Sequence, residues 1–248
     1  MHKEFTEKMA TDFLWSTYFG ITKTDAELNK RKAAYCCADR AYRDLCRRIS
    51  FAYSSSEIEE MKKEEREEYI QKKQEFRYCV SEYIVESILN LKSDFDGFHK
   101  AICSGIISFS NGNNSCNKKF NEIFNEPLNY GLAQKWLNMT IKNMIVMGLW
   151  DNILDSYLPY LHIPLDSYIF DAASGEEGEP ICEGENVKHL GINEKDYFNN
   201  YTWSNIPNNN AFIEKYYQYQ KRIKEKTNCN QIEWEHKAWI AESKKNRK

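Results

Sequence analysis

The sequence is poor in the two residues that most often form turns. Its 248 residues include only 10 glycines and 5 prolines, whereas average usage is roughly 7% and 5%. Short strands joined by tight turns need many such residues, so the composition disfavours β-sandwiches and β-barrels. We also find no internal repeat and no long segment of alternating hydrophobicity. The sequence therefore predicts a mostly α fold.

The sequence also lacks a long apolar segment. Its mean hydropathy is -0.73, and polar residues interrupt the longest apolar runs, at 102–109 and 141–150. A membrane-spanning helix needs about 20 consecutive, predominantly apolar residues, so we expect no membrane association. The first residues show no basic segment followed by an apolar stretch and a cleavage site. We therefore expect a cytoplasmic location.

The cysteines lack the spacing of a metal site or a disulfide framework. There are 8 cysteines and 5 histidines, and no CxxC pair occurs. Structural zinc sites usually use such closely paired ligands. A chain of this size with irregular cysteine spacing and no export signal is more typical of reduced thiols. We expect neither a metal nor another cofactor.

Charge is distributed unevenly, although the net charge is only -3. Segment 174–186 contains five glutamates and no basic residue. Basic residues form three clusters: Lys30, Arg31, Lys32, Arg40, Arg43, Arg47 and Arg48; Lys221, Arg222, Lys224 and Lys226; and Lys244, Lys245, Arg247 and Lys248. Such clusters either neutralise phosphates or form solvated helix faces.

Hydrophobic periodicity predicts helices along most of the chain. Thr24 and Glu27, for example, have capping-box spacing ahead of an apolar stripe. The predicted helices cover 25–50, 57–90, 94–109, 118–125, 131–149, a segment beginning near Asp166, 211–226 and 232–243. We expect one all-helical domain, in which two lobes, about 1–125 and 126–248, would place an active site between them.

Polar residues follow one face of the apolar helix predicted at 131–149. Lys135, Asn138 and Lys142 are spaced i, i+3 and i+7, and Asp166 comes 31 residues after Lys135. A carboxylate at a helix N-terminus is by itself most often a cap. Beside a lysine in an apolar pocket, it can also orient an amine nucleophile and stabilise positive charge on a sugar. Such a pair suits cleavage of a glycosidic bond.

These residues resemble the helix-hairpin-helix DNA glycosylases, and among them the archaeal 8-oxoguanine DNA glycosylase branch. The resemblance rests on KWLNMTIK, which runs from Lys135 to Lys142, and on HIPLD, which ends at Asp166. It covers 131–175 and a short C-terminal stretch, and LPYLHIPLDSY would form the end of the hairpin. It implies that Lys135 forms a Schiff base with the deoxyribose, that Asp166 assists, and that Lys142 is the fallback nucleophile.

The C-terminal segment IEWEHKAWI extends the resemblance. Glu235 and Trp239 are spaced i and i+4, so they share a helix face. In the family an acid and a tryptophan at this spacing hold the extruded base, which assigns base binding to Glu235 and Trp239. Met139 would form the opposite wall. The ordinary alternative is that Trp239 belongs to the hydrophobic core.

The resemblance also implies the biological role and the partner. The protein would be a monomeric base excision repair enzyme, a DNA glycosylase and AP lyase that acts on double-stranded DNA containing a damaged base. Lys221, Arg222 and Lys224 are the predicted contacts to the DNA backbone. The fold would be helical and glycosylase-like, with a helix-hairpin-helix-type motif.

Two other functional classes remain open. A non-catalytic helical interaction or scaffold protein would explain the charged stretch 57–75, and in it Lys135 would be a lysine whose ammonium reaches the surface. Such a protein gives no reason for Lys135, Asp166 and Trp239 to line one cavity. A cysteine hydrolase using Cys36 or Cys37 with a histidine lacks a recognisable local motif.

Overall fold

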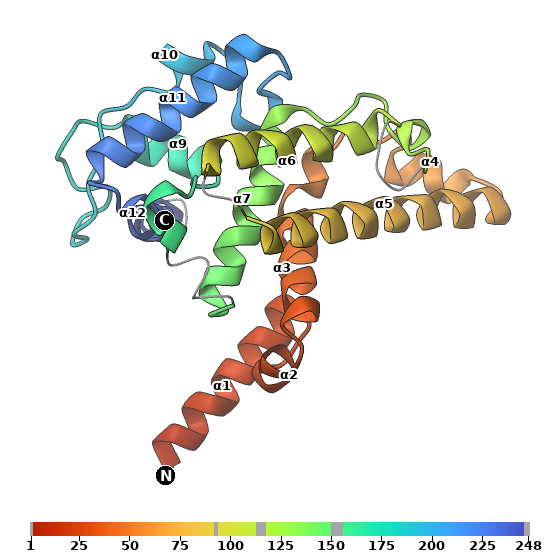
Figure 1. Ribbon diagram of the computed structural model, residues 1–248, viewed down its shortest axis with the longest axis horizontal. Helices are drawn as coiled ribbons and strands as arrows, with labels where there is room; N and C mark the ends of the chain where they lie inside the picture. The colour runs from red at the N-terminus through yellow and green to blue at the C-terminus, as the bar shows by residue number, and fades with distance from the viewer. Residues whose placement is uncertain (1, 92–93, 113–117, 150–155, 246–248) are drawn as a thin grey trace.

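The computed structural model describes residues 2–91, 94–112, 118–149 and 156–245, which form helices joined by irregular segments (Figure 1). Within these ranges the β-structure is limited to two isolated bridges, Phe51 with Phe124 and Pro180 with Lys188. The predicted mostly α fold is therefore confirmed. None of the helices in these ranges is long and apolar enough to cross a membrane.

The helices pack around one hydrophobic core that includes residues from both halves of the chain. The α-helices are α1 (His2–Phe19), α2 (Lys23–Leu28), α3 (Lys30–Leu45), α4 (Ser55–Glu60), α5 (Lys63–Leu89), α6 (Phe95–Ser110), α7 (Tyr130–Val146), α9 (Ser167–Ser174), α10 (Lys195–Phe198), α11 (Asn210–Lys226) and α12 (Gln231–Lys245). The short 3₁₀ turns are η1 (Cys46–Arg48), η2 (Asn121–Ile123), η3 (Leu158–Tyr160) and η4 (Trp203–Asn205).

Helix α7 lies at the centre of the molecule (Figure 1). Most of its residues are buried, as expected for a helix that is apolar around most of its circumference. Helices α3 and α6 both pack against it. Trp136, near the start of α7, donates to the Ala38 carbonyl at 3.0 Å and its ring lies 5.0 Å from that of Tyr42. Met147, just after α7, reaches Cys37 instead, so α3 and α7 run antiparallel.

Two predicted long helices are each broken in two. Region 25–50 forms α2 and α3 because Asn29 leaves the helical conformation (φ -137°, ψ 78°) and its side chain accepts the Lys32 N–H. The cap of α2 is Thr22 rather than Thr24. Region 57–90 is likewise divided into α4 and α5 where Met61 becomes extended (ψ 152°). At Asn29 the polar side chain competes with the helix for backbone hydrogen bonds.

The helix predicted at 118–125 is wrong, because this segment forms only the single turn η2. Its backbone is bonded to another part of the chain instead. The Asn125 N–H donates to the Ser50 carbonyl, and the Ala52 N–H donates to the Ile123 carbonyl, each at 2.9 Å. Backbone groups used in this way are not free to continue a helix.

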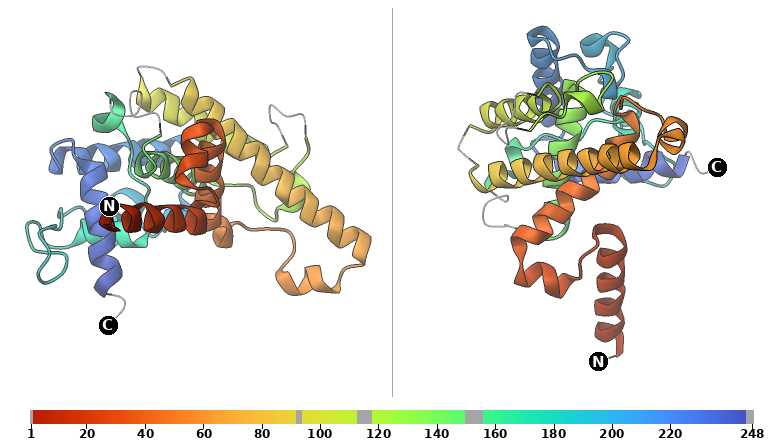
Figure 2. Two further views of the ribbon diagram at one scale, coloured as in Figure 1. Left: turned by 90° about the horizontal axis from the view of Figure 1, so that it is seen from below. Right: turned by 90° about the vertical axis from the view of Figure 1, so that its right-hand side faces the viewer.

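Helix α1, which the sequence did not predict, projects from the body as an arm (Figures 1 and 2). It packs against α2 and α3. Met9, Phe13 and Leu14 on this arm are 57%, 69% and 62% exposed. Helix α1 has no continuous apolar stripe packed on the core, so the hydrophobic periodicity that predicts a helix is weak in this part of the sequence.

The predicted hairpin end can be described only in part. Residues 150–155 lie outside the described ranges, and the remainder of the segment contains the 3₁₀ turn η3, Leu158–Tyr160. The helix-hairpin-helix motif therefore stays a prediction.

A cluster of buried polar side chains joins α6, α7, α11 and the segment before α9. The rings of His99 and His162 are 4.5 Å apart. His99 Nε2 lies 3.0 Å from Asn138 Oδ1, and the Tyr216 hydroxyl lies 3.2 Å from His162 Nδ1. Other groups that contact the cluster are Asp96, Cys103, Tyr130, Tyr217 and Gln220. This cluster ties the centre of the fold together through hydrogen bonds as well as apolar contacts.

Burial lowers the pKa of both histidines. The pKa of His99 is well below its ordinary value, because burial and the nearby His162 both disfavour its charged form. Burial also lowers the pKa of His162, and the hydrogen bond from its Nε2 to Asp96, 3.0 Å long, offsets part of the effect.

We expect the protein to lose stability as the pH falls below about 6.5. Unfolded histidines take up protons near that pH, whereas folding lowers the pKa of His99 and His162. The unfolded state then binds more protons, so the free energy of unfolding falls with the pH. Urea unfolding between pH 8 and 5 measures this, and the His99→Gln variant should lose less stability over that range than the wild type. Equal losses in the two proteins would contradict the prediction.

Candidate functional site

Lys135 of α7 and Asp166 at the start of α9 form a buried ion pair. Lys135 Nζ lies 2.7 Å from Asp166 Oδ2, and the two side chains are only 6% and 14% exposed. Asp166 is also the N-cap of α9, since its Oδ1 accepts the Ile169 N–H at 3.0 Å. One carboxylate oxygen thus holds the helix and the other holds the ammonium group. The lysine and the aspartate singled out from the sequence do converge.

Two tryptophans border this ion pair. Trp239 Nε1 of α12 donates to Asp166 Oδ2 at 3.3 Å, and the indole is 36% exposed. The Trp203 ring of η4 has its centre 5.5 Å from Lys135 Nζ. Trp239 was anticipated as a site residue and Trp203 was not. An aromatic face beside an ammonium group is a favourable cation–π arrangement.

Gly131 allows η4 to lie this close to α7. A Cβ atom at Gly131 would be 1.9 Å from the Trp203 carbonyl oxygen. The Gly131 N–H donates to the Ile206 carbonyl at 3.3 Å on the same side of the helix. In the sequence, a glycine at the start of α7 could have indicated that another segment packs closely against the helix there. It could not have shown that this segment is η4.

A second buried ion pair lies further along α7. Lys142 Nζ is 2.8 Å from Glu235 Oε1 and 2.6 Å from Oε2, and the Glu235 side chain is 1% exposed. Burial raises the pKa of Glu235, and the Lys142 charge offsets part of that effect. Glu235 is one turn before Trp239 on α12, and Trp239 contacts Asp166, so the two ion pairs are near neighbours. Helix α12 supplies a partner to each pair, Trp239 to one and Glu235 to the other.

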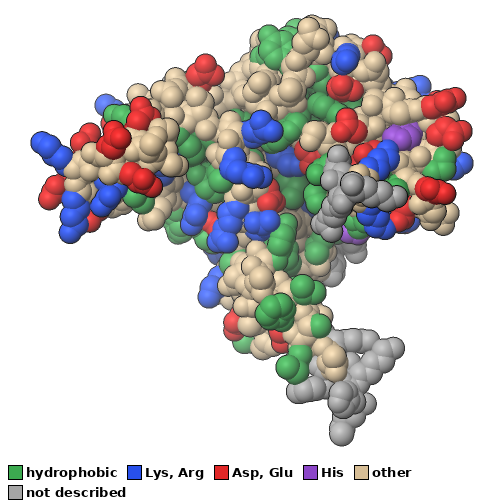
Figure 3. Space-filling view, turned by 180° about the vertical axis from the view of Figure 1, so that it is seen from behind, with side chains coloured by type: hydrophobic (Ala, Val, Ile, Leu, Met, Phe, Trp, Pro, Cys, Tyr) green, Lys and Arg blue, Asp and Glu red, His purple; other side chains and the backbone are tan. Residues whose placement is uncertain are grey.

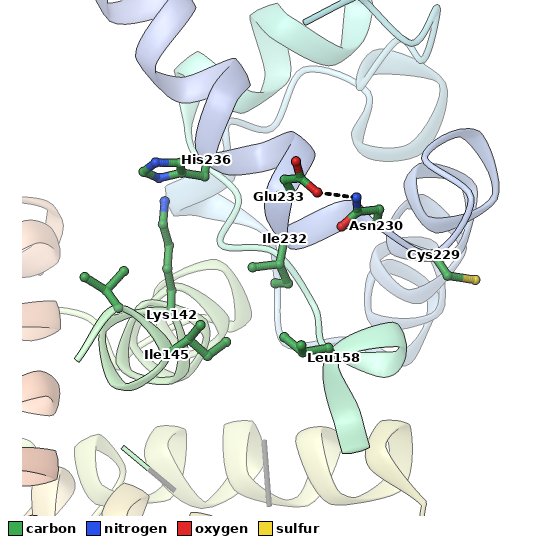
Figure 4. A pocket seen from close by; sticks show the side chains of 9 residues that line it. Lys142, Ile145, Leu158, Cys229, Asn230, Ile232, Glu233 and His236 are labelled. Carbon is green, nitrogen blue, oxygen red and sulfur yellow. Dashed lines mark hydrogen bonds between the residues drawn. The ribbon is translucent and has the colours of Figure 1, made fainter. Parts of the chain in front are cut away.

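A pocket of about 400 Å³ opens beside Lys142 (Figure 4). Its apolar walls come from α7, η3 and α12, and the Lys142 ammonium group points toward His236. Lys135, Asp166 and Trp239 do not line this pocket; they contact one another directly instead. Met139, the predicted opposite wall of the base site, is half-buried on α7 and packs against the core.

Amide side chains hold the segment that leads into Asp166. The amides of Asn138 and Gln220 donate to the Ile163 carbonyl at 3.2 and 2.8 Å. Gln134 Oε1 accepts the Leu165 N–H at 3.4 Å. Because Gln134 and Asn138 flank Lys135 on α7, the same helix that carries the ammonium group also positions its carboxylate partner.

Asp44 brings the first half of the chain to the site. It is half-buried near the end of α3 and lies 2.9 Å from Arg40. Burial raises the pKa of Asp44, while the charges of Arg40, Lys135 and Arg47 lower it. Asp44 is therefore close to the Lys135 ion pair. The sequence offers no signal for this, since the proximity arises from the packing of α3 on α7.

The predicted DNA-backbone residues lie apart from this pair, on α11. Lys221 and Arg222 are exposed, and Arg222 pairs with Glu225 at 3.3 Å. Lys224 lies over the Tyr160 ring, 4.5 Å from its centre. No described contact joins these three cations to Lys135 or Asp166.

The cysteines proposed for a hydrolase do not suit nucleophilic chemistry. Burial raises the pKa of both Cys36 and Cys37, which disfavours the reactive thiolate. Cys37 is fully buried, and its Sγ lies 3.3 Å from Met147 Sδ rather than beside a histidine.

No protein-family model, curated protein or solved structure matches the chain. The two ion pairs and the side chains around them are therefore the features that bear on function.

We expect Asp166→Ala to destabilise the protein by about 3–5 kcal/mol, because it leaves the Lys135 ammonium group buried without a partner and also removes a helix cap. Asp166→Asn keeps a capping oxygen and should cost less. Urea unfolding measures both. Glu233→Ala is the matched control, since Glu233 pairs with Lys237 on the exposed face of α12 and its loss should have little effect. Equal effects of Asp166→Ala and Glu233→Ala would contradict the assignment.

We expect the Lys142–Glu235 pair to be strongly coupled in stability. Lys142→Met strands a buried carboxylate and Glu235→Met strands an ammonium group, so each should cost about 3–5 kcal/mol. The double variant buries neither charge and should recover most of that loss. A double-mutant cycle by urea unfolding gives the coupling energy. Additive losses would show that the two groups do not depend on each other.

Proposed function

We propose that the protein is a DNA glycosylase and AP lyase that removes 8-oxoguanine from double-stranded DNA. Lys135 is the nucleophile and Asp166 the assisting carboxylate. The observation that carries the proposal is the buried 2.7 Å contact between these two groups at the start of α9, next to two tryptophans. The choice of 8-oxoguanine among damaged bases comes from the family resemblance.

The first step would break the bond between the sugar and the base. An amine attacks only when it has lost its extra proton, and Asp166 Oδ2 is within hydrogen-bonding distance of Lys135 to receive it. Lys135 Nζ would then bond to C1′ while the base leaves with the electron pair of the glycosidic bond. The departing base anion would take that proton from Asp166. A carboxylate at a helix N-terminus is stabilised as an anion, so the ionised Asp166 would then stabilise the positive charge on the sugar.

The second step would cleave the DNA strand. Opening of the sugar ring gives a Schiff base between Lys135 and C1′. Loss of a proton from C2′ then expels the 3′ phosphate by β-elimination, and water hydrolyses the Schiff base to release Lys135. The two groups that this chain supplies are the Lys135 amine and the Asp166 carboxylate. They already contact each other before DNA binds.

The flipped base would lie against α7 and α12. Trp239 is exposed enough to stack on a base and is fixed by its hydrogen bond to Asp166. Glu235 is almost fully buried and bound to Lys142, so we assign this pair to the wall of the base site. In this assignment the ion pair with Glu235 holds Lys142 away from the chemistry.

The alternative, a non-catalytic helical interaction protein, is favoured by one observation. Helix α1 projects from the body with its apolar residues Met9, Phe13 and Leu14 exposed (Figure 2). Exposed apolar side chains on a projecting helix are typical of a contact surface. This alternative leaves the buried Lys135–Asp166 pair without a role beyond stability.

Borohydride trapping tests the proposal. A duplex oligonucleotide containing one 8-oxoguanine should yield a covalent complex on a denaturing gel, because borohydride reduces the Schiff base. Lys135→Gln should abolish the complex and Lys142→Gln should retain it. Asp166→Asn should slow its formation by about 10²–10⁴-fold, the usual contribution of a positioned acid–base group.

Two outcomes would change the assignment. A complex that persists in Lys135→Gln and disappears in Lys142→Gln would identify Lys142 as the nucleophile. If folded wild-type protein forms no complex and releases no base from 8-oxoguanine or abasic duplexes, the interaction protein becomes the better proposal. Circular dichroism of each variant verifies that it is folded.

A further inference from the structure

The end of α3 and the turn η1 carry two arginines without acidic partners. Arg47 and Arg48 are exposed, and within the described part of the chain neither takes part in an ion pair or a side-chain hydrogen bond. The arginines earlier in α3 differ, since Arg40 pairs with Asp44 and Arg43 with Asp39, at 2.9 and 2.8 Å. The guanidinium groups of Arg47 and Arg48 are therefore free to bind an external anion.

These arginines lie at the end of α3 that is nearer to the Lys135–Asp166 pair. Because α3 and α7 are antiparallel, the end of α3 lies beside the first turns of α7, where Lys135 is located. Asp44, three residues before Arg47, is close enough to be influenced by the charges of both Lys135 and Arg47. The turn η1, which directly follows α3, therefore begins near the end of α7 that carries Lys135.

The other basic clusters are largely neutralised within the protein. The acidic segment 174–186 folds back on the C-terminal helices, where Glu177 pairs with Lys226 and Glu185 with Lys244. Glu242 likewise pairs with Lys245 at 2.8 Å. Among the described residues of these two clusters, only Lys221 is exposed without a partner, whereas η1 carries two such cations side by side.

The space-filling view shows how charged side chains are distributed over one face of the protein. Seen from behind, Lys and Arg side chains gather on the body just above the base of the N-terminal arm (Figure 3). This is the part of the body into which α3 leads from the arm (Figure 2). Acidic side chains are frequent toward the side formed by the C-terminal helices (Figure 3).

We propose that Arg47 and Arg48 bind the phosphodiester backbone of the DNA strand beside the nucleotide that reaches Lys135. This inference rests on the proposed function, because a sugar at Lys135 has a phosphate on either side of it. Cations at the protein surface near that sugar therefore face those phosphates. Arginine suits this role, since its planar guanidinium group donates two parallel hydrogen bonds to a phosphate.

Fluorescence anisotropy with a labelled duplex containing one 8-oxoguanine tests the inference. Arg47→Ala/Arg48→Ala should weaken binding about tenfold or more, because it removes two charged groups that donate hydrogen bonds to phosphate. The slope of log K against log salt should fall by about 1.8 if two phosphate contacts are lost. Trapping yield at saturating protein should stay near that of the wild type, since the arginines bind the strand and do not react.

Lys62→Ala/Lys63→Ala is the matched control. It removes the same charge from two exposed neighbouring residues at the start of α5, so it should leave both the affinity and the salt slope close to wild-type values. Lys221→Ala/Arg222→Ala tests the competing site on α11. A greater loss of affinity in that variant than in Arg47→Ala/Arg48→Ala would overturn the inference.

The outcomes separate this inference from the proposed function. If wild-type protein is trapped and binds the duplex but Arg47→Ala/Arg48→Ala binds equally well, the inference fails and the proposed function stands. If binding depends on both arginines but no protein is trapped, the arginines bind DNA and the proposed chemistry fails. If wild-type protein neither binds nor is trapped, both are overturned.

Discussion

Two lysines on one buried helix impose the main constraint on this structure. An ammonium group buried without a partner is costly, so α7 can occupy the centre of the fold only where other segments deliver carboxylates to Lys135 and Lys142. Asp166 comes from the start of α9 and Glu235 from α12, both buried or nearly so. The packing of α12 against α9 therefore satisfies the charges of α7 as well as covering apolar surface.

The polar cluster beside these pairs makes the arrangement rigid. Asn138 contacts His99 and also donates to the Ile163 carbonyl, so the same side chain joins α6 to the segment that leads into Asp166. Such networks specify one arrangement of the core when their members are paired. The proposed chemistry would depend on this arrangement, because in an active site a misplacement of about 1 Å can cost about 10²-fold in rate.

The sequence predicted site residues correctly where they lie on one helix or at a short spacing. The stripe of Lys135, Asn138 and Lys142, and the helix beginning after Asp166, follow from periodicity and capping, and the two lysines do face partners. Glu235 and Trp239 were found together, but their i and i+4 spacing could not show that one contacts Lys142 and the other Asp166. Trp203 and Asp44 reach the site through tertiary packing, which leaves no local pattern. The break at Asn29 was missed because apolar residues continue at helical spacing on both sides of it. The break at Met61 was missed because the glutamates and lysines around it favour a helix and give no stop signal.

The N-terminal arm meets the body through the second half of α1, where Asp12, Trp15, Tyr18 and Phe19 make contacts. The helix ends at Phe19, and Gly20 follows in a left-handed conformation (φ 73°). The Tyr18 ring lies under the Arg40 guanidinium, with 4.0 Å between the ring centre and the guanidinium carbon. An 18-residue helix is about 27 Å long, so a rotation of about 10° at its base moves the far end by about 5 Å. The arm therefore pivots at Gly20, where a small change in backbone conformation produces a large displacement of the N-terminal end of α1.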